Sequence, residues 1–283
     1  MLKIRNLLFA PGDSARKTEK ALASMADGII LDLEDSVAPG HKDEARAMVA
    51  ALVPDLSRPG TIVRINPRGT PHYLADLAAI VPARPAAIML PKCTGPHDMA
   101  ALDHHMEALE VAAGLTPGTI AVIALVTESA ASILSMDYRG APPRLQALCF
   151  GAEDFSADLG VAPRPAGVYN AAAAAARALT LIAAAAAGLP AIDTPWPDPR
   201  DPEGLRTEAA AAARDGFAGK LCIHPDQLAP VAEAFSPAPD QVRWAHAVRD
   251  GFAANTGAGV FLLDGKMIDR PHLKLAERIL AAL

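Results

Sequence analysis

The sequence has few of the features that mark extracellular or membrane proteins. Its three cysteines, Cys93, Cys149 and Cys222, are odd in number and scattered, which argues against a disulfide framework or a zinc site. The longest apolar stretch, residues 171–189, is mostly alanine and contains Arg177, so it predicts a soluble helix rather than a membrane span. The opening segment MLKIRNLLFAPGD has too few apolar residues for a signal peptide. These absences predict a cytoplasmic protein with reduced thiols and no membrane contact.

Positive charge is also scarce. The chain has 26 Lys and Arg against 32 Asp and Glu, a net charge of −6, and no basic block, so nucleic acid is not expected as a partner. No predicted strand is followed by a GxGxxG or GxxxxGK[ST] loop, which argues against a doubly wound sheet that binds nucleotides. The 283 residues are enough for one large α/β domain and a small appendage.

The sequence does contain a regular alternation of apolar runs and helical patterns. Eight apolar runs lie near residues 5–10, 28–33, 61–66, 86–91, 120–127, 146–151, 189–193 and 217–223. Helical patterns lie between them, for example at residues 14–26, 42–53, 71–80 and 98–113. Eight strands with crossover helices predict an α/β fold, a (β/α)8 TIM barrel over residues 1–236, in which all strand ends converge on one face.

The pattern changes after the eighth strand, and residues 237–283 are predicted to lie outside the closed barrel. Residues 240–254 predict a helix. The next stretch, NTGAGVFLLDGKMIDRP, is typical of a hairpin with Asp264 and Gly265 at its turn, and a final helix is expected after Pro271. We expect this helix–hairpin–helix segment to act as a lid or an oligomerisation arm, with Asp269 as its most prominent acid.

Three of the predicted strands end in carboxylates. GIILDLED ends with Asp32, Glu34 and Asp35, IAVIALVTE ends with Glu128, and LQALCFGAED ends with Asp154. Carboxylates gathered at one face would take up protons unless a cation lay among them. Oxygen ligands of this kind suit Mg²⁺, with Mn²⁺ as the alternative. The sequence therefore predicts a metal site whose ligands are Glu128 and Asp154.

Each of these acids also has a structural interpretation. Glu128 and Asp154 precede helical patterns and can serve as helix-capping acids. Asp32 and Glu34 can pair with Arg64, which lies inside the third strand, TIVRINP. The planar fork of Arg64 also suits bidentate capture of a substrate carboxylate, which a lysine cannot copy. Two acids at the ends of neighbouring strands favour the metal site over two independent caps.

Basic residues and a histidine lie at other strand ends. Arg16, Lys17 and Lys20 fall in the first turns of a helix, where cations oppose the helix dipole unless an anion is bound, and a solvated basic face is the alternative. Lys92, after the fourth strand, is predicted to be charged and ion-paired rather than a Schiff-base nucleophile. His224, after the eighth strand, is expected to be a hydrogen-bonded structural group.

Many short segments, in order along nearly the whole chain, match one family. They are RNLLFAPGD, GIILDLEDSV, KDEAR, VRIN, IMLPK, TES, CFGAEDFSADLG, AID, GFAGKLCIHPDQ, FSP and DGKMIDRP. On these segments the sequence resembles the CitE-like CoA-ester lyases of the HpcH/HpaI aldolase superfamily. The resemblance implies a Mg²⁺-dependent carbon–carbon lyase that interconverts a 3-hydroxyacyl-CoA with an acyl-CoA and a 2-oxo acid. It also implies a homotrimer or a hexamer.

The resemblance assigns roles to particular residues. Glu128 and Asp154 match the metal ligands, and Glu128 is expected to contact the substrate as well. Arg64 matches the arginine that holds the oxo-acid carboxylate. The remaining assignments are Glu34 and Asp35 as acids that orient Arg64 and metal-bound water, Arg16, Lys17 and Lys20 as cations that meet the CoA phosphates, and Asp269 as a catalytic base from a neighbouring subunit.

Three other enzyme functions fit the same resemblance. They are a citryl-ACP lyase subunit of a citrate lyase complex, a malyl-CoA thioesterase and a class II free-pyruvate aldolase. The aldolases carry a DxEH motif with a histidine base where this chain has DLED, and they lack the GKMID tail. The acyl-CoA is not specified by the sequence, because malyl, citramalyl and citryl groups differ by a methyl or carboxymethyl group, and a pocket discriminates a methylene by only about 1–3 kcal/mol.

Overall fold

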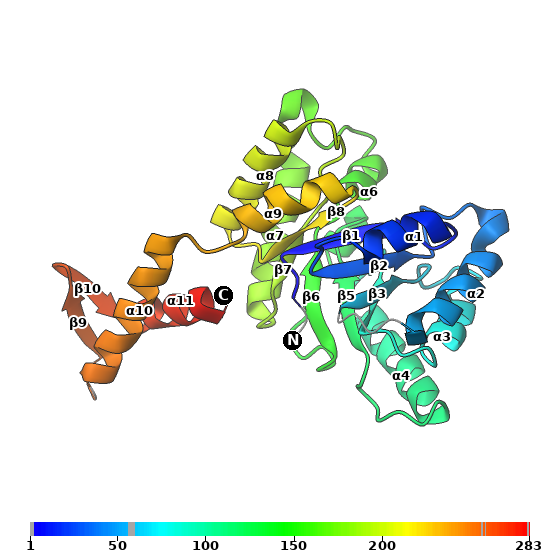
Figure 1. Ribbon diagram of the computed structural model, residues 1–283, viewed down its shortest axis with the longest axis horizontal. Helices are drawn as coiled ribbons and strands as arrows, with labels where there is room; N and C mark the ends of the chain where they lie inside the picture. Colours follow the sequence, from blue (N-terminus) through cyan, green and yellow to red (C-terminus); the bar gives the residue numbers. More distant parts are fainter. Residues whose placement is uncertain (1–2, 56–59, 256, 258, 282) are drawn as a thin grey trace. The chain divides into compact units, whose positions relative to one another are not determined.

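The protein is described by a computed structural model covering residues 3–55, 60–255, 257, 259–281 and 283. It divides into two compact units, Met1–Ala234 and Phe235–Leu283. In the first unit eight parallel strands close into a barrel in sequence order, which confirms the predicted (β/α)8 fold (Figure 1). The strands are β1 (Asn6–Pro11), β2 (Gly28–Asp32), β3 (Thr61–Arg64), β4 (Ala87–Leu90), β5 (Ala121–Leu125), β6 (Leu145–Cys149), β7 (Ala191–Asp193) and β8 (Gly219–Cys222).

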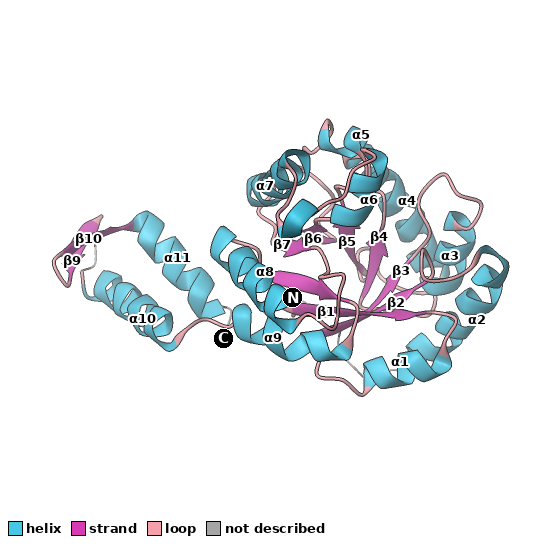
Figure 2. Ribbon diagram, turned by 90° about the horizontal axis from the view of Figure 1, so that it is seen from above, coloured by secondary structure: helices cyan, strands magenta, loops and turns pink. Residues whose placement is uncertain are grey.

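Helices surround the strands, as Figure 2 shows. They are α1 (Ala15–Leu22), α2 (Lys42–Leu52), α3 (Tyr73–Ile80), α4 (Pro96–Ala112), α5 (Ala130–Ile133), α6 (Ala152–Asp158), α7 (Ala171–Ala186), α8 (Pro202–Asp215) and α9 (Leu228–Ala234). Short 3-10 turns add Pro39–His41, Val53–Asp55, Pro165–Gly167 and Pro225–Gln227. Among the described residues, no helix is both long and apolar enough to cross a membrane.

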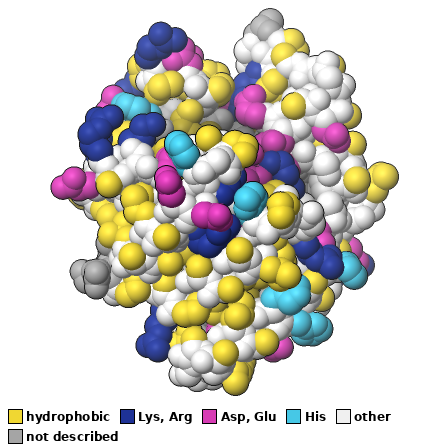
Figure 3. All heavy atoms as spheres, turned by 90° about the vertical axis from the view of Figure 1, so that its right-hand side faces the viewer, with side chains coloured by type: hydrophobic (Ala, Val, Ile, Leu, Met, Phe, Trp, Pro, Cys, Tyr) yellow, Lys and Arg dark blue, Asp and Glu magenta, His cyan; other side chains and the backbone are white. Residues whose placement is uncertain are grey.

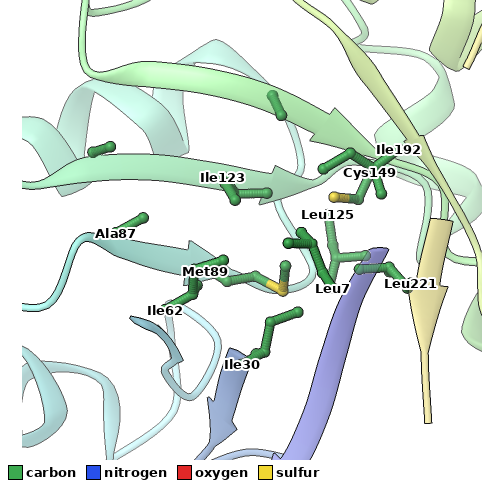
Figure 4. Packing of buried hydrophobic residues seen from close by; sticks show 12 residues of the cluster. Leu7, Ile30, Ile62, Ala87, Met89, Ile123, Leu125, Cys149, Ile192 and Leu221 are labelled. Carbon is green, nitrogen blue, oxygen red and sulfur yellow. The ribbon is translucent and has the colours of Figure 1, made fainter. Parts of the chain in front are cut away.

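The inside of the barrel is filled by alternate residues of the strands (Figure 4). The buried cluster comprises Leu7, Ile30, Ile62, Ala87, Met89, Ala121, Ile123, Leu125, Ala147, Cys149, Ile192 and Leu221. Fully burying one such large aliphatic side chain stabilises the fold by roughly 1.5–3 kcal/mol. The polar strand-end residues are therefore presented on a rigid, closed scaffold.

Charged side chains lie on the outer face of β7 and β8. Asp193 accepts hydrogen bonds from Arg177 Nε and Lys220 Nζ, both at 3.0 Å, and Lys220 also donates to Glu208 at 2.6 Å. The side chains of Asp193 and Lys220 have no exposed surface. Burial raises the pKa of Asp193, but the charges of Lys220 and Arg177 bring it below its ordinary value. This network ties α7 and α8 to the barrel.

The second unit consists of α10 (Pro239–Ala254), β9 (Val260–Leu263), β10 (Lys266–Asp269) and α11 (Arg270–Ala281). The strands pair antiparallel, and the turn residues Asp264 and Gly265 have φ of +50° and +75°. Two left-handed residues suit the tight turn of a two-residue hairpin, so the predicted hairpin is confirmed. Its small core contains Ala245, Val248, Ile268 and Ala276. Asp269 ends the hairpin directly before α11.

Candidate active site

Arg64 is held by two acids from the end of β2. Its Nε and Nη2 donate to the two oxygens of Asp32, both at 2.7 Å, and its Nη1 lies 3.0 Å from Oε2 of Glu34. The guanidinium also lies over the ring of Phe9, 4.7 Å from its centre. Burial lowers the pKa of Arg64, but the hydrogen bonds and charge of Asp32 raise it well above its ordinary value. Arg64 is a permanent, fixed cation.

Asp32 thus occupies the Nε–Nη2 edge of Arg64. The sequence had left two roles open for Arg64, pairing with this acid and binding a substrate carboxylate. A guanidinium has five N–H groups, and two of those of Arg64 donate to Asp32, while Nη1 is ion-paired with Glu34 without a hydrogen bond. The remaining N–H groups lie on Nη1 and Nη2, the end-on edge of the fork. A substrate carboxylate would meet Arg64 along that edge.

Lys92 joins the acids of three strands. Its Nζ lies 2.5 Å from Oε1 of Glu34, 3.4 Å from Asp35 and 3.7 Å from Oδ1 of Asp154. Burial lowers the pKa of Lys92, but the bond to Glu34 and the surrounding carboxylates raise it above its ordinary value. A lysine in this environment stays protonated and is a poor nucleophile, so the prediction of a charged, ion-paired Lys92 is confirmed.

Glu128 is fixed by the main chain around it. The N–H of Lys92 donates to Oε2 of Glu128, from a lysine whose φ of +49° lies in the left-handed region. Gly151 packs so tightly that an added Cβ would lie 2.7 Å from Cγ of Glu128. The N–H of Gly151 in turn donates to the hydroxyl of Thr127 at 2.9 Å. These contacts hold the end of β5 against the start of α6, where Asp154 lies.

The electrostatics of Glu128 indicate uncompensated negative charge. Its side chain is buried, and burial together with the charges of Glu34 and Asp154 raises its pKa to about 8, against the lowering effects of the Lys92 N–H and Arg64. The two acids predicted as metal ligands are therefore near enough to repel each other. A divalent cation between them would relieve that repulsion.

Five carboxylates, which we call the acid cluster, share this end of the barrel: Asp32, Glu34, Asp35, Glu128 and Asp154. Three cations face them, namely Arg64, Lys92 and the buried Lys42, so the cluster has two negative charges in excess when all five carboxylates are ionised. Oε2 of Glu34 is buried and receives no hydrogen bond from the described residues, although Arg64 lies nearby. The excess charge and the orphaned oxygen fit a hydrated divalent cation.

Two protein ligands suit Mg²⁺ in particular. Among the described residues, no three His, Cys, Asp or Glu side chains are grouped to hold one metal ion. Mg²⁺ keeps several waters and is commonly held by one or two carboxylates plus substrate oxygens. Glu128 and Asp154 would therefore be enough, with Glu34 placed to accept a hydrogen bond from metal-bound water.

A polar layer beneath the acid cluster was missed in the sequence. Lys42 Nζ donates to the main-chain carbonyls of Leu33 and Glu34 at 2.8 and 2.7 Å, and Asn66 donates to Leu33 at 3.0 Å. Asn66 also binds Asp76, which accepts from Arg46 Nε at 2.7 Å. The sequence did contain a signal for this layer, because the KDEAR and VRIN segments include Lys42, Arg46 and Asn66. These residues fix the turn that carries Glu34.

The two neighbouring acids of α6 have separate environments. Asp154 is half-buried and faces Lys92, whereas the half-exposed Glu153 pairs with Arg164 at 2.7 Å. Arg164 also binds Glu208 at 2.7 Å and lies over the ring of Tyr169. Glu153 therefore anchors α6 to α8, and Asp154 belongs to the acid cluster.

The remaining predicted residues belong to other elements. Arg16, Lys17 and Lys20 are exposed on α1. His224 caps the 3-10 turn after β8, with its Nδ1 accepting from the N–H of Asp226 at 3.2 Å, so its predicted structural role is confirmed. Asp269 belongs to the second unit. Figure 3 shows one face of the molecule, where basic and acidic side chains lie beside each other near its centre.

Comparison with known proteins identifies a matching family and similar solved structures. The family model for HpcH/HpaI aldolase/citrate lyase matches residues 5–225. Citrate lyase subunit beta of Haemophilus influenzae is 33% identical over 98% of this chain and 95% of that protein. A (3S)-malyl-CoA thioesterase of Cereibacter sphaeroides is 35% identical over 98% of this chain and 93% of its own length. The structure of CitE from Mycobacterium tuberculosis with magnesium, acetoacetate and coenzyme A superposes with a TM-score of 0.79 and 34% identity, covering 100% of this chain and 99% of that one.

Proposed function

The chain belongs to the HpcH/HpaI aldolase/citrate lyase family, as its sequence segments predicted, and on that premise we propose that it is a Mg²⁺-dependent CoA-ester lyase. The enzyme would cleave or form the C–C bond of a 3-hydroxyacyl-CoA of the citramalyl-, malyl- or citryl-CoA type. The products of cleavage are an acyl-CoA and a 2-oxo acid. The magnesium, acetoacetate and coenzyme A bound to the Mycobacterium tuberculosis relative support this choice of metal and substrates.

The observation that carries the proposal is the acid cluster with its excess negative charge. Glu128 follows β5 and Asp154 lies in α6, directly after β6, and the charge of Asp154 contributes to the raised pKa of Glu128. Arg64 belongs to the same group of residues. It is a fixed cation, and the N–H groups that do not donate to Asp32 leave one edge of its guanidinium available. A 2-oxo acid presents a ketone and a carboxylate side by side, which is the pattern that a metal and an arginine together can bind.

Cleavage requires loss of the 3-hydroxyl proton and movement of the C–C bonding electrons into the thioester, which becomes an enolate. Mg²⁺ held by Glu128 and Asp154 would supply positive charge to the hydroxyl oxygen and, in the product, to the oxo acid. Arg64 binds the carboxylate of that acid. Glu34 and Asp35, fixed by Lys92, hold Arg64 and the surrounding water in place.

In the condensation direction, a base must remove a proton from the α carbon of the acyl-CoA. We assign this role to Asp269, supplied by another copy of the chain in a homotrimer or hexamer, with residues 237–283 as the lid and oligomerisation segment. The hairpin supports this assignment: Val260, Leu262 and Met267 expose 50%, 73% and 59% of their surface on the face that also carries Asp269. A chain of this family would cover such an apolar face with a second copy.

The CoA part of the substrate needs cations for its phosphates. Arg16, Lys17 and Lys20 lie within five residues of one another on α1 and are exposed to solvent. Arg16 and Lys17 lie in the first turn of α1, where cations are unfavourable unless an anion binds, whereas Lys20 lies in the last turn of the same helix. We therefore assign these three residues to the CoA phosphates.

A thioesterase is the second candidate, because the Cereibacter sphaeroides relative is a (3S)-malyl-CoA thioesterase at 35% identity over nearly the whole chain. The two activities are distinguished by their products. Synthetic malyl-CoA and citramalyl-CoA are incubated with the protein and Mg²⁺, and the products are separated by chromatography and identified by mass. Acetyl-CoA with an oxo acid supports the lyase, whereas free CoA with the intact hydroxy acid supports the thioesterase.

A further inference from the structure

Asp269 is in close contact with His272, three residues further along the chain. Nδ1 of His272 lies 2.5 Å from Oδ1 of Asp269, and the main-chain N–H of Asp269 donates to the same nitrogen at 3.2 Å. Both side chains are half-buried, with 35% of Asp269 and 39% of His272 exposed. The carboxylate is therefore held by a neighbour while part of it stays accessible.

The imidazole ring itself is held by packing. The ring of Trp244, from α10, meets it edge to face with the ring centres 6.4 Å apart. Trp244 packs in turn against the core of the second unit, which contains Ala245 and Ala276. Since α10, β10 and α11 form one small core, the orientation of His272 follows from the fold of that unit and does not require substrate.

The contact leaves one oxygen of the carboxylate for reaction. Oδ1 of Asp269 and its main-chain N–H both meet Nδ1 of His272. Oδ2 is the other oxygen of the carboxylate, and it is the one that can receive a proton from substrate.

We propose that His272 is the positioning residue of the catalytic base, so that Asp269 and His272 act as a pair. This inference rests on the role that the proposed function gives to Asp269. In the condensation direction the α C–H bond of the acyl-CoA breaks, its electron pair enters the enolate, and the proton passes to Oδ2 of Asp269. The contact with Nδ1 of His272 keeps Oδ1 engaged and so directs Oδ2 at the substrate carbon.

A purely structural role would be different. Asp269 immediately precedes α11, and a side chain at the third helical position that accepts the N–H of the preceding residue is one half of a capping box. A cap stabilises the helix without touching the reaction. Loss of a cap would lower the melting temperature and leave proton abstraction unchanged at temperatures where the protein is folded.

The test measures proton abstraction directly, in the full-length protein with Mg²⁺. Acetyl-CoA is incubated in D₂O with oxalate in place of the oxo acid, and uptake of deuterium into the methyl group is followed by mass spectrometry. His272→Leu removes the Nδ1 contact, His272→Asn keeps a polar group at a similar distance, and Asp269→Asn removes the base. His246→Leu, on α10 of the same unit, controls for replacing a half-buried histidine.

We expect Asp269→Asn to lose exchange by about 100-fold or more and His272→Leu by about 10- to 100-fold. His272→Asn should restore most of the rate, His246→Leu should match the wild type, and the KM for acetyl-CoA should change little in any of them. If His272→Leu exchanges at the wild-type rate while Asp269→Asn does not exchange, His272 is not a positioning residue. Asp269 then remains the assigned base. Exchange that survives in Asp269→Asn, or is absent from the wild type, would overturn the assigned base and this inference with it.

Discussion

Asp32 and Arg64 face each other at paired positions of β2 and β3, and each oxygen of the carboxylate accepts a hydrogen bond of 2.7 Å from the guanidinium. The side chain of Asp32 is almost completely buried, and burial raises its pKa, but the bond and charge of Arg64 lower it below its ordinary value. The pair is thus ionised and rigid. It fixes the direction in which the other edge of Arg64 points.

Replacement of Arg64 by lysine should be nearly as damaging as replacement by alanine. A single ammonium cannot span both oxygens of Asp32 and also present two N–H groups to a substrate carboxylate. We expect kcat/KM for the oxo acid to fall by about 100-fold or more in both variants. Arg68→Lys, an arginine of the next loop that pairs with Asp98, is the matched control and should remain active. Near-normal turnover of Arg64→Lys would show that only charge is needed there.

Asp154 and Glu153 offer a direct comparison of two adjacent acids. Asp154→Asn should weaken Mg²⁺ binding by about 100-fold or more, since loss of outer contacts of a metal site alone costs 10- to 100-fold. Glu153→Gln should change it by less than about threefold, because Glu153 pairs with Arg164 outside the acid cluster. Isothermal titration of the two purified variants with Mg²⁺ measures both constants. Equal losses would mean that α6 contributes only general negative charge.

Gly151→Ala should disturb the metal site without replacing either proposed ligand. Its φ of −112° is acceptable for alanine, so the effect comes from the new Cβ, which would lie 2.7 Å from Cγ of Glu128. Overpacking of this kind costs about 1–3 kcal/mol of stability, and the displaced carboxylate should bind Mg²⁺ about tenfold more weakly. Gly40→Ala has nothing within 4 Å of its Cβ and is the control. Unchanged Mg²⁺ affinity in Gly151→Ala would show that Glu128 has room to move.

Asp193 should contribute to stability and to its dependence on pH. Asp193→Asn leaves Lys220 and Arg177 without their shared carboxylate and should cost about 3–5 kcal/mol of unfolding free energy. Because the folded-state pKa of Asp193 is below its unfolded value of roughly 3.9, its contribution is present above about pH 4 and is lost as the pH falls through the folded value. Urea denaturation at pH 7 and at pH 3 should therefore show a smaller pH effect in Asp193→Asn than in the wild type. A control, Asp198→Asn, alters an exposed pair with Arg200 and should change stability little.

The barrel and the acids at its strand ends could be predicted because both depend on local pattern. Apolar runs ending in GIILDLED, IAVIALVTE and LQALCFGAED place Asp32, Glu128 and Asp154 at the carboxyl ends of parallel strands. The left-handed backbone of Lys92 could not be predicted in this way, since no pattern marks a lysine whose N–H must reach Glu128. That conformation follows from contacts between residues 36 positions apart.

The different roles of neighbouring acids also depend on long-range contacts. Glu153 and Asp154 are adjacent in the sequence, yet the first pairs with Arg164 and the second faces Lys92. Asp32 was left open between metal chemistry and a partner for Arg64, and the structure makes it that partner. Sequence pattern locates the acids, whereas the distribution of cations from other loops decides what each acid does.

The central claim is tested most directly by following formation of the C–C bond. Acetyl-CoA and propionyl-CoA carrying ¹³C in the acyl group are each incubated with glyoxylate, pyruvate or oxaloacetate, with the protein and Mg²⁺, and the CoA esters are analysed by mass spectrometry. The account predicts, for at least one pair, a labelled 3-hydroxyacyl-CoA that is absent after removal of metal with EDTA and absent with Asp154→Asn. No condensation product from any pair, or a product formed equally with EDTA or with Asp154→Asn, would contradict it.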